Sequence, residues 1–98
     1  MREKEIEKIL TAGVKSMGGR AYKWTSPGND GVPDRIVFLP GRTPIFVELK
    51  TETGRLTDLQ KTQIGRLKGL GQDVRVLKGR DAVLEFLDEL KEVMPHDV

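Results

Sequence analysis

Three stretches of the chain repeat apolar residues at the spacing of an amphipathic helix. They cover residues 3–17, 57–70 and 81–93, and each keeps its apolar side chains on one face at 3.6 residues per turn. Thr57 is a suitable N-cap for the second stretch, and Gly71 follows it as a stop signal. The apolar residues of the three faces are Ile6, Ile9, Leu10, Val14 and Met17, then Leu59, Ile64, Leu67 and Leu70, then Val83, Phe86, Leu87 and Leu90. We therefore predict three helices.

Four shorter stretches have the composition of β-strands. They are residues 20–24, 35–39, 45–50 and 73–77. The Pro- and Gly-containing turn at residues 40–44 has a length suited to joining the second and third strands as an antiparallel hairpin. The fourth strand is reached through a helix, so we expect it to run parallel to a neighbour.

The resulting order, α-β-β-β-α-β-α, predicts an α/β fold with a mixed sheet of about four strands flanked by helices. A chain of 98 residues is long enough for one hydrophobic core and too short for two. We predict a single domain over residues 1–98, with its core at about 3–90 and a tail at 94–98. Residues 25–33 have turn chemistry throughout, so we expect an exposed loop, where function often lies.

Composition excludes several kinds of site. The chain has no cysteine and one histidine, His96, which falls in the predicted tail. The lack of cysteine excludes disulfides and thiolate metal sites, and a single histidine nearly excludes a histidine triad or a zinc cluster. Any bound metal would therefore have oxygen ligands. Because no apolar run is long enough to cross a bilayer and the charged N-terminus lacks a signal-peptide segment, we expect a cytoplasmic protein with no membrane partner.

The net charge of +2 hides an asymmetry along the chain. Residues 1–80 carry 16 Lys and Arg against 9 Asp and Glu, whereas residues 81–98 carry 1 against 6. A basic body fits contact with a polyanion such as DNA, because Lys and Arg that neutralise phosphates release counterions. A solvated surface of mixed charge explains the same counts equally well.

Charged residues interrupt the strand-like stretch of residues 31–50. Strand alternation puts Glu48 and Lys50 on one face, and the hairpin would bring Asp34 level with them. Charges in a half-buried strand cost free energy unless they are paired or bind a metal. Two carboxylates beside a backbone carbonyl suit Mg²⁺, and a nearby lysine can orient a water, so the pattern indicates metal-dependent phosphodiester hydrolysis. An ion pair that closes a strand end is the alternative that spacing alone leaves open.

The sequence resembles the PD-(D/E)xK nuclease superfamily and, more specifically, its VRR-NUC (virus-type replication-repair nuclease) family in the short stand-alone form of phages and bacteria. The likeness covers roughly residues 3–90, and the family's restriction-endonuclease-like core, α-β-β-β-α-β, is similar to the order expected above. It is carried by Gly31-Val32-Pro33-Asp34-Arg35, Phe46-Val47-Glu48-Leu49-Lys50, Gly54-Arg55-Leu56, Leu59-Gln60, Leu67-Lys68-Gly69-Leu70-Gly71 and Val74-Arg75-Val76.

This resemblance implies a role for each residue of the motif. Asp34 and Glu48 would bind Mg²⁺, for which Mn²⁺ would substitute, with help from the main-chain carbonyl of Leu49. Lys50 would assist the attacking water.

The resemblance also implies a glutamate on the first helix and a glutamine on the second, which here would be Glu7 and Gln60. Glu7 lies at the edge of its apolar face and Glu3 lies within it, so either acid fits the pattern. Gln60 falls on the apolar stripe of its helix, where a buried amide needs a partner. Gln63 falls on the same stripe, and spacing does not separate the two glutamines.

Further basic residues near the predicted loops are candidate DNA contacts, although each taken singly is also typical of a solvated surface. They are Lys23, Arg35, Arg55 and Lys61. Trp24 could stack on a base, but one aromatic residue beside a strand is more often part of a core.

The charged motif and the resemblance together predict a structure-selective DNA endonuclease, and the resemblance implies products with a 5′-phosphate and a 3′-hydroxyl. Because so short a chain offers little surface for a duplex, we expect a homodimer that acts on branched DNA such as Holliday junctions. The alternatives are a catalytically inactive nucleic-acid-binding module with a nuclease-like fold, and a small interaction protein.

Overall fold

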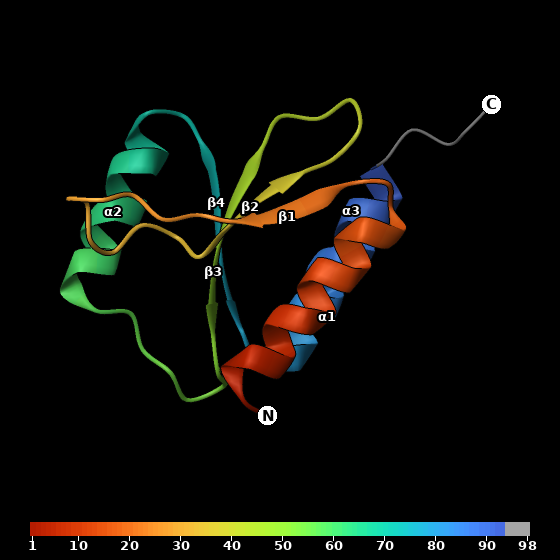
Figure 1. Cartoon of the computed structure of the whole chain (residues 1–98), viewed down its shortest axis with the longest axis horizontal. Helices are drawn as coiled ribbons and strands as arrows, with labels where there is room; N and C mark the ends of the chain where they lie inside the picture. Colours follow the sequence, from red (N-terminus) through yellow and green to blue (C-terminus); the bar gives the residue numbers. More distant parts are fainter. Residues whose placement is uncertain (94–98) are drawn as a thin grey trace.

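A four-stranded mixed sheet lies at the centre of the fold, which a computed structural model describes for residues 1–93 (Figure 1). The strand order is β1-β2-β3-β4; neighbours among the first three are antiparallel, and β3 and β4 are parallel. The elements are α1 (Glu3–Ser16), β1 (Arg20–Lys23), β2 (Arg35–Phe38), β3 (Ile45–Lys50), α2 (Asp58–Gly69), β4 (Asp73–Lys78) and α3 (Gly79–Val93). The predicted α/β order and the parallel fourth strand are confirmed.

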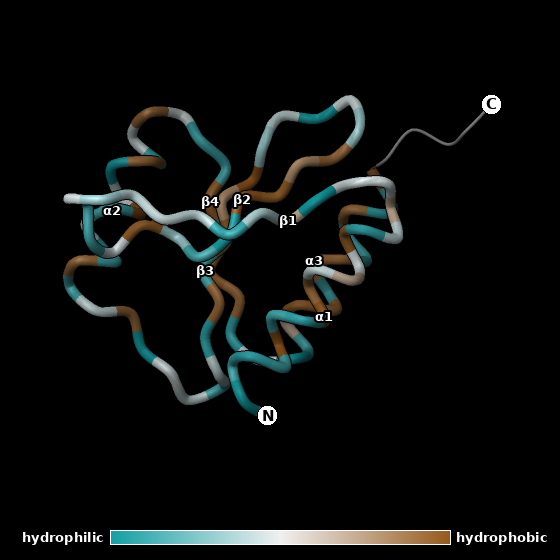
Figure 2. The backbone as a smooth tube through the Cα atoms, in the orientation of Figure 1, coloured by the Kyte–Doolittle hydropathy of each residue, from teal (hydrophilic) through white to brown (hydrophobic). Residues whose placement is uncertain are grey.

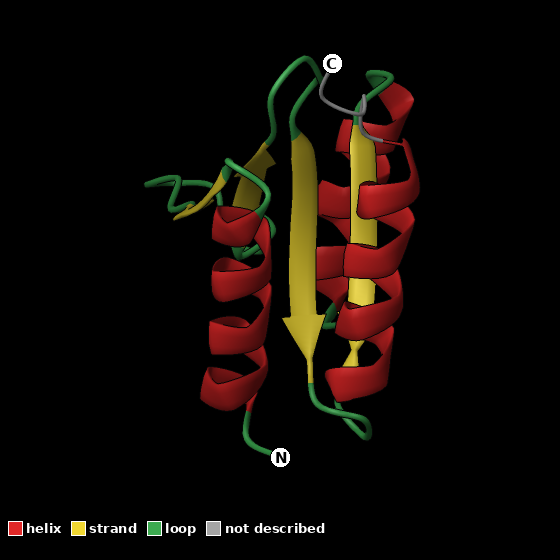
Figure 3. Cartoon of the chain, turned by 90° about the vertical axis from the view of Figure 1, so that its right-hand side faces the viewer, coloured by secondary structure: helices red, strands yellow, loops and turns green. Residues whose placement is uncertain are grey.

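The helices form layers on the two faces of the sheet. Helices α1 and α3 pack side by side against one face, and α2 lies on the other (Figures 1 and 3). In Figure 2 the ribbons of α1 and α3 alternate between hydrophilic and hydrophobic residues, as amphipathic helices do. The core between these helices and the sheet contains Ile6, Leu10, Val14, Val37, Leu39, Ile45, Val47, Leu49, Leu77, Val83, Phe86, Leu87 and Leu90.

The second helix buries less than its sequence predicts. Leu59 and Leu70 are 57% and 74% exposed, so their predicted place on the buried face is wrong. Ile64 is the buried residue of α2, and Leu67 is half-buried. Because the loop of residues 24–34 and the sheet give α2 a narrow contact, Gln60, Ile64 and Leu67, spaced at i, i+4 and i+7, face inward instead.

Within residues 1–93, no helix combines the length and the apolarity that crossing a bilayer requires. The predicted tail and His96 lie outside the described residues.

Candidate active site where β2, β3 and α2 meet

The hairpin of β2 and β3 brings two carboxylates together. Arg35 pairs with Val47, so the next position of the same register sets Asp34 opposite Glu48. Asp34 Oδ2 accepts a hydrogen bond from the backbone N–H of Leu49 at 2.9 Å, which fixes Asp34 just before the start of β2. The hairpin therefore places the two carboxylates side by side, as the sequence predicts.

Glu48 is a buried acid with one satisfied and one unsatisfied oxygen. Its side chain is 1% exposed. Oε2 accepts a hydrogen bond from Gln60 Nε2 at 3.1 Å and lies 3.5 Å from Lys50 Nζ. Oε1 is also buried but has no hydrogen-bond partner among residues 1–93. Because a buried polar atom without a partner costs free energy, this oxygen points to a missing ligand.

The surroundings of Glu48 favour its protonated form. Burial raises its pKa most, the negative charge of Asp34 raises it further, and the positive charge of Lys50 opposes both. The result is a pKa of about 7. A cation placed between the two carboxylates would relieve both the desolvation and the repulsion, so the site is suited to exchanging a proton for a metal ion.

Gln60 is held at both ends of its side-chain amide. Its Oε1 accepts from the backbone N–H of Thr57 at 2.9 Å, and the Thr57 hydroxyl accepts from the backbone N–H of Gln60 at 3.1 Å. This capping box starts α2 and turns Nε2 toward Glu48. Gln63 is half-buried and makes no side-chain hydrogen bond among the described residues. Thr57, which the sequence predicts only as an N-cap, therefore also positions Gln60 beside Glu48.

Of the two candidate acids on α1, Glu3 is exposed to solvent, whereas Glu7 is half-buried and contacts Arg35 of β2. Glu7 Oε1 accepts from Arg35 Nε at 2.9 Å and from a terminal guanidinium nitrogen of the same residue. The remaining terminal nitrogen of Arg35 donates to the carbonyl of Ala21 at 2.9 Å. Glu7 is therefore tied to the residue that follows Asp34, and the guanidinium of Arg35 is engaged within the protein.

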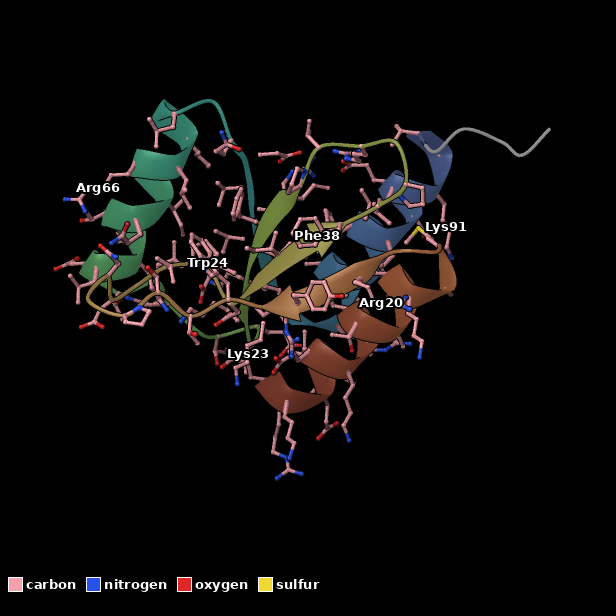
Figure 4. All side chains as sticks on the ribbon, turned by 45° about the horizontal axis from the view of Figure 1, so that its top comes forward. Arg20, Lys23, Trp24, Phe38, Arg66 and Lys91 are labelled. Carbon is pink, nitrogen blue, oxygen red and sulfur yellow. The ribbon has the colours of Figure 1, made fainter. Side chains whose placement is uncertain are left out.

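The other candidate residues are placed around the site in different ways. The ring of Trp24 packs against Phe46, with centroids 5.3 Å apart, between the sheet and α2 (Figure 4). Lys23 is exposed and lines a hollow beside Glu7 and Arg35. Arg55 and Lys61 are also exposed, and they line a separate hollow next to Lys50.

The donor set fits a hard divalent cation. Asp34 and Glu48 would supply carboxylate oxygens, and Glu48 Oε1 is buried without a hydrogen-bond partner in the part of the chain that the structure describes. Residues 1–93 contain no group of three or more Asp, Glu, His or Cys side chains arranged to hold a metal. Two carboxylates, a main-chain carbonyl such as that of Leu49, and several waters match the coordination that Mg²⁺ prefers, whereas Zn²⁺ prefers nitrogen and sulfur.

Comparison with known families gives this geometry a context. A family model described as the VRR-NUC domain matches residues 6–81. The chain belongs to the VRR-NUC family. The match confirms the resemblance seen in the sequence and identifies the chain as a nuclease-family domain.

Relatives of this VRR-NUC domain agree with the assignment. A phage protein named "Putative nuclease p44", from Acyrthosiphon pisum secondary endosymbiont phage 1, is 47% identical over 81 residues, covering 83% of this chain and 87% of its own. A solved structure titled "VRR_NUC domain" superposes with a TM-score of 0.78 at 26% identity, covering 95% and 97% of the two chains. A second, titled "VRR_NUC domain protein", has a TM-score of 0.75 at 18% identity over 99% and 93%, and shows the shared fold.

Proposed function

We propose that this VRR-NUC domain is a Mg²⁺- or Mn²⁺-dependent endonuclease that hydrolyses phosphodiester bonds in DNA. The observation that carries the proposal is the buried Oε1 of Glu48, which has no hydrogen-bond partner among the described residues 1–93. The carboxylate that carries it lies opposite Asp34 and beside Lys50. Buried carboxylate oxygens generally have hydrogen-bond partners, so this oxygen favours a site that a bound ligand completes over an ion pair that only closes the strand.

Each residue has a role in this hydrolysis. Asp34 and Glu48 would hold the cation, which when bound would supply Lewis-acid polarisation of the phosphate and a more acidic water. Lys50 orients the attacking water and stabilises negative charge that develops on the phosphate. Gln60 holds Oε2 of Glu48 and so fixes the rotation of this carboxylate, which leaves Oε1 to bind the cation that the site would hold. Water attacks the phosphorus in line with the P–O3′ bond, which breaks; the attacking water loses a proton to solvent and the leaving 3′-oxygen takes one up, so the products are a 5′-phosphate and a 3′-hydroxyl.

The proposed substrate is branched DNA such as a Holliday junction, and the proposed active form is a homodimer. A two-fold dimer would present two sites to a junction that is itself close to two-fold symmetric. Exposed Tyr22 and Phe38 support this assembly, because their rings form a T-shaped pair, 5.9 Å apart, beside the free edge of β1.

Cleavage of a panel of labelled DNAs tests the proposal. Single-stranded, duplex, flap and four-way-junction DNAs are incubated with Mg²⁺, Mn²⁺ or EDTA, and we expect metal-dependent cleavage with the junction preferred. Lys50→Met should abolish cleavage while leaving Mn²⁺-dependent thermal stabilisation in place. Full activity in Lys50→Met, or no metal-dependent cleavage of any DNA, would show the proposal to be wrong.

The competing proposal is a binding module that has kept the fold without turnover. It predicts DNA binding without cleavage and no rise in melting temperature with Mn²⁺. A rise that disappears in Asp34→Asn would instead indicate a working metal site, because a ligand that binds only the folded state stabilises it.

A further inference from the structure

A basic hollow opens next to the site, between the end of β3, the loop after it, α2 and β4. Its volume is about 310 Å³, and its walls carry four cationic side chains, those of Lys50, Arg55, Lys61 and Lys78. Leu56 and Val76 add apolar surface, and no acidic side chain lines it. We call this feature the basic hollow. Apolar walls strengthen the field of nearby charges, because they exclude water.

Two of these cations are forced together by the parallel strands. In the register of β3 and β4, Lys50 pairs with Lys78 and Glu48 pairs with Val76, so the two lysines are direct neighbours on the face that carries Glu48. Like charges placed side by side on a sheet cost free energy. Binding an anion between them would reverse that cost.

Three of the four cations of the basic hollow are not paired with an acid among the described residues. Arg55, Lys61 and Lys78 make no ion pair or side-chain hydrogen bond within the part of the chain that the structure describes. Other arginines on the sheet behave differently: Arg35 pairs with Glu7, and Arg75 with Asp73. The positive charge of these three side chains is therefore available to an anionic ligand.

The loop that carries Arg55 is anchored to the fold. The backbone amides of Glu52 and Arg80 hold the pKa of the Glu52 carboxyl below its usual range, although desolvation opposes them. Glu52 also lies against Gly79, where a Cβ would come within 2.7 Å of its Cγ. Because the loop is tied to the start of α3 at one end and to the α2 cap at the other, Arg55 starts from a fixed backbone.

We propose that the basic hollow binds a backbone phosphate of the nucleic-acid substrate, next to the phosphate that is cleaved. Lys50 belongs to both places: it lies 3.5 Å from Glu48 and lines the hollow. A strand whose scissile phosphate rests at Asp34 and Glu48 would then place its neighbouring phosphate between Arg55, Lys61 and Lys78. This inference rests on the proposed function, since it takes DNA as the substrate, and it adds Lys78 to the candidate DNA contacts.

The test measures DNA binding without cleavage. Wild-type protein and the variants Lys78→Met and Arg55→Gln are titrated in EDTA onto fluorescently labelled duplex and four-way-junction DNA over a range of salt concentrations. Matched controls are Lys91→Met on α3 and Arg66→Gln on the outer side of α2, both away from the hollow (Figure 4). We expect each hollow variant to lower the slope of log Kd against log salt by about 1, and each control to leave it unchanged.

A second measurement locates the phosphate. DNAs that carry one neutral methylphosphonate at successive positions around the cut should bind the wild type several-fold more weakly at one position, and that penalty should vanish in Lys78→Met. If the hollow variants have the same salt slope as the wild type, and the wild type cleaves DNA, the phosphate site in the hollow is wrong and the proposed nuclease function stands. If the hollow variants have reduced slopes but the wild type cleaves no DNA, the phosphate site stands and the nuclease function is wrong. If the wild type binds no DNA, the phosphate site is wrong.

Discussion

Gln60 donates a hydrogen bond to the buried Oε2 of Glu48 at 3.1 Å, while the oxygen of the same amide caps α2. One side chain thus couples the start of a helix to the orientation of the central acid. Because Thr57 holds Oε1, the amide cannot turn over without losing the cap, and the donor is kept on Glu48.

Removing this amide should impair the reaction more than the fold. In Gln60→Ala, Glu48 loses its neutral donor and its carboxylate is free to rotate, so we expect DNA cleavage or Mn²⁺ affinity to fall about 10- to 100-fold. Gln63→Ala is the matched control, because Gln63 lies half-buried on the same helix without such a contact. Steady-state cleavage rates and Mn²⁺ titrations make the comparison. Equal losses in the two variants would contradict a specific role for Gln60.

The raised pKa of Glu48 makes the stability of the metal-free protein depend on pH. The carboxyl takes up its proton near pH 7 when folded and near its ordinary value of 4.5 when unfolded, so between these values the folded state binds more protons. Stability is therefore lost as pH rises from about 4.5 through 7, by up to roughly 3 kcal/mol in total. Urea denaturation in EDTA at several pH values between 5 and 8 measures this loss.

Glu48→Gln provides the control for that pH dependence. It keeps the shape and burial of the side chain but cannot ionise, so its unfolding free energy should change less between pH 5 and 8. The single histidine, His96, is present in both proteins, so the difference between the profiles belongs to Glu48. Parallel profiles for the two proteins would show that Glu48 titrates normally.

The ion pair of Glu7 and Arg35 should contribute to stability rather than to DNA binding. Both side chains are largely buried, 27% and 18% exposed, so Arg35→Met should destabilise the fold by about 1–3 kcal/mol by leaving Glu7 without its partner. Lys23→Met, in the same hollow but exposed, should change stability by less than about 0.5 kcal/mol. A double-mutant cycle with Glu7→Gln measures the coupling. A coupling energy near zero would contradict this structural role and leave Arg35 as a candidate DNA contact.

Much of this site follows from short-range sequence pattern. Strand alternation is enough to put Glu48 and Lys50 on one face, and the length of the turn at residues 40–44 is enough to bring Asp34 beside them. Both depend on geometry that repeats from one residue to the next. The order of elements follows for the same reason, because hydrophobic period distinguishes helix from strand.

Other features depend on contacts between distant segments. The exposure of Leu59 and Leu70 follows from how narrowly α2 meets the sheet, which helical period alone does not specify. Lys78 joins Lys50 only through the register of two parallel strands, fixed by tertiary packing. The sequence held one signal for Lys78, since a parallel fourth strand must place some of its residues beside the ExK motif.

The loop before β2 should tolerate change at one glycine and not at another. Gly31 has φ +90°, and a Cβ there would lie 2.6 Å from the backbone carbonyl of Leu59, at the start of α2. Gly31→Ala should therefore add a steric clash of about 1–3 kcal/mol to the strain of a left-handed alanine, and should lower cleavage by displacing Gln60.

Gly28→Ala separates these two costs, because Gly28 has φ +81° but no heavy atom lies within 4 Å of the position that a Cβ would take there. It should show the backbone strain alone, about 1–2 kcal/mol, with cleavage retained. Chemical denaturation and cleavage rates of both variants measure the difference. If Gly31→Ala were no worse than Gly28→Ala in both measurements, the close approach of this loop to α2 would not be what holds Gln60 against Glu48.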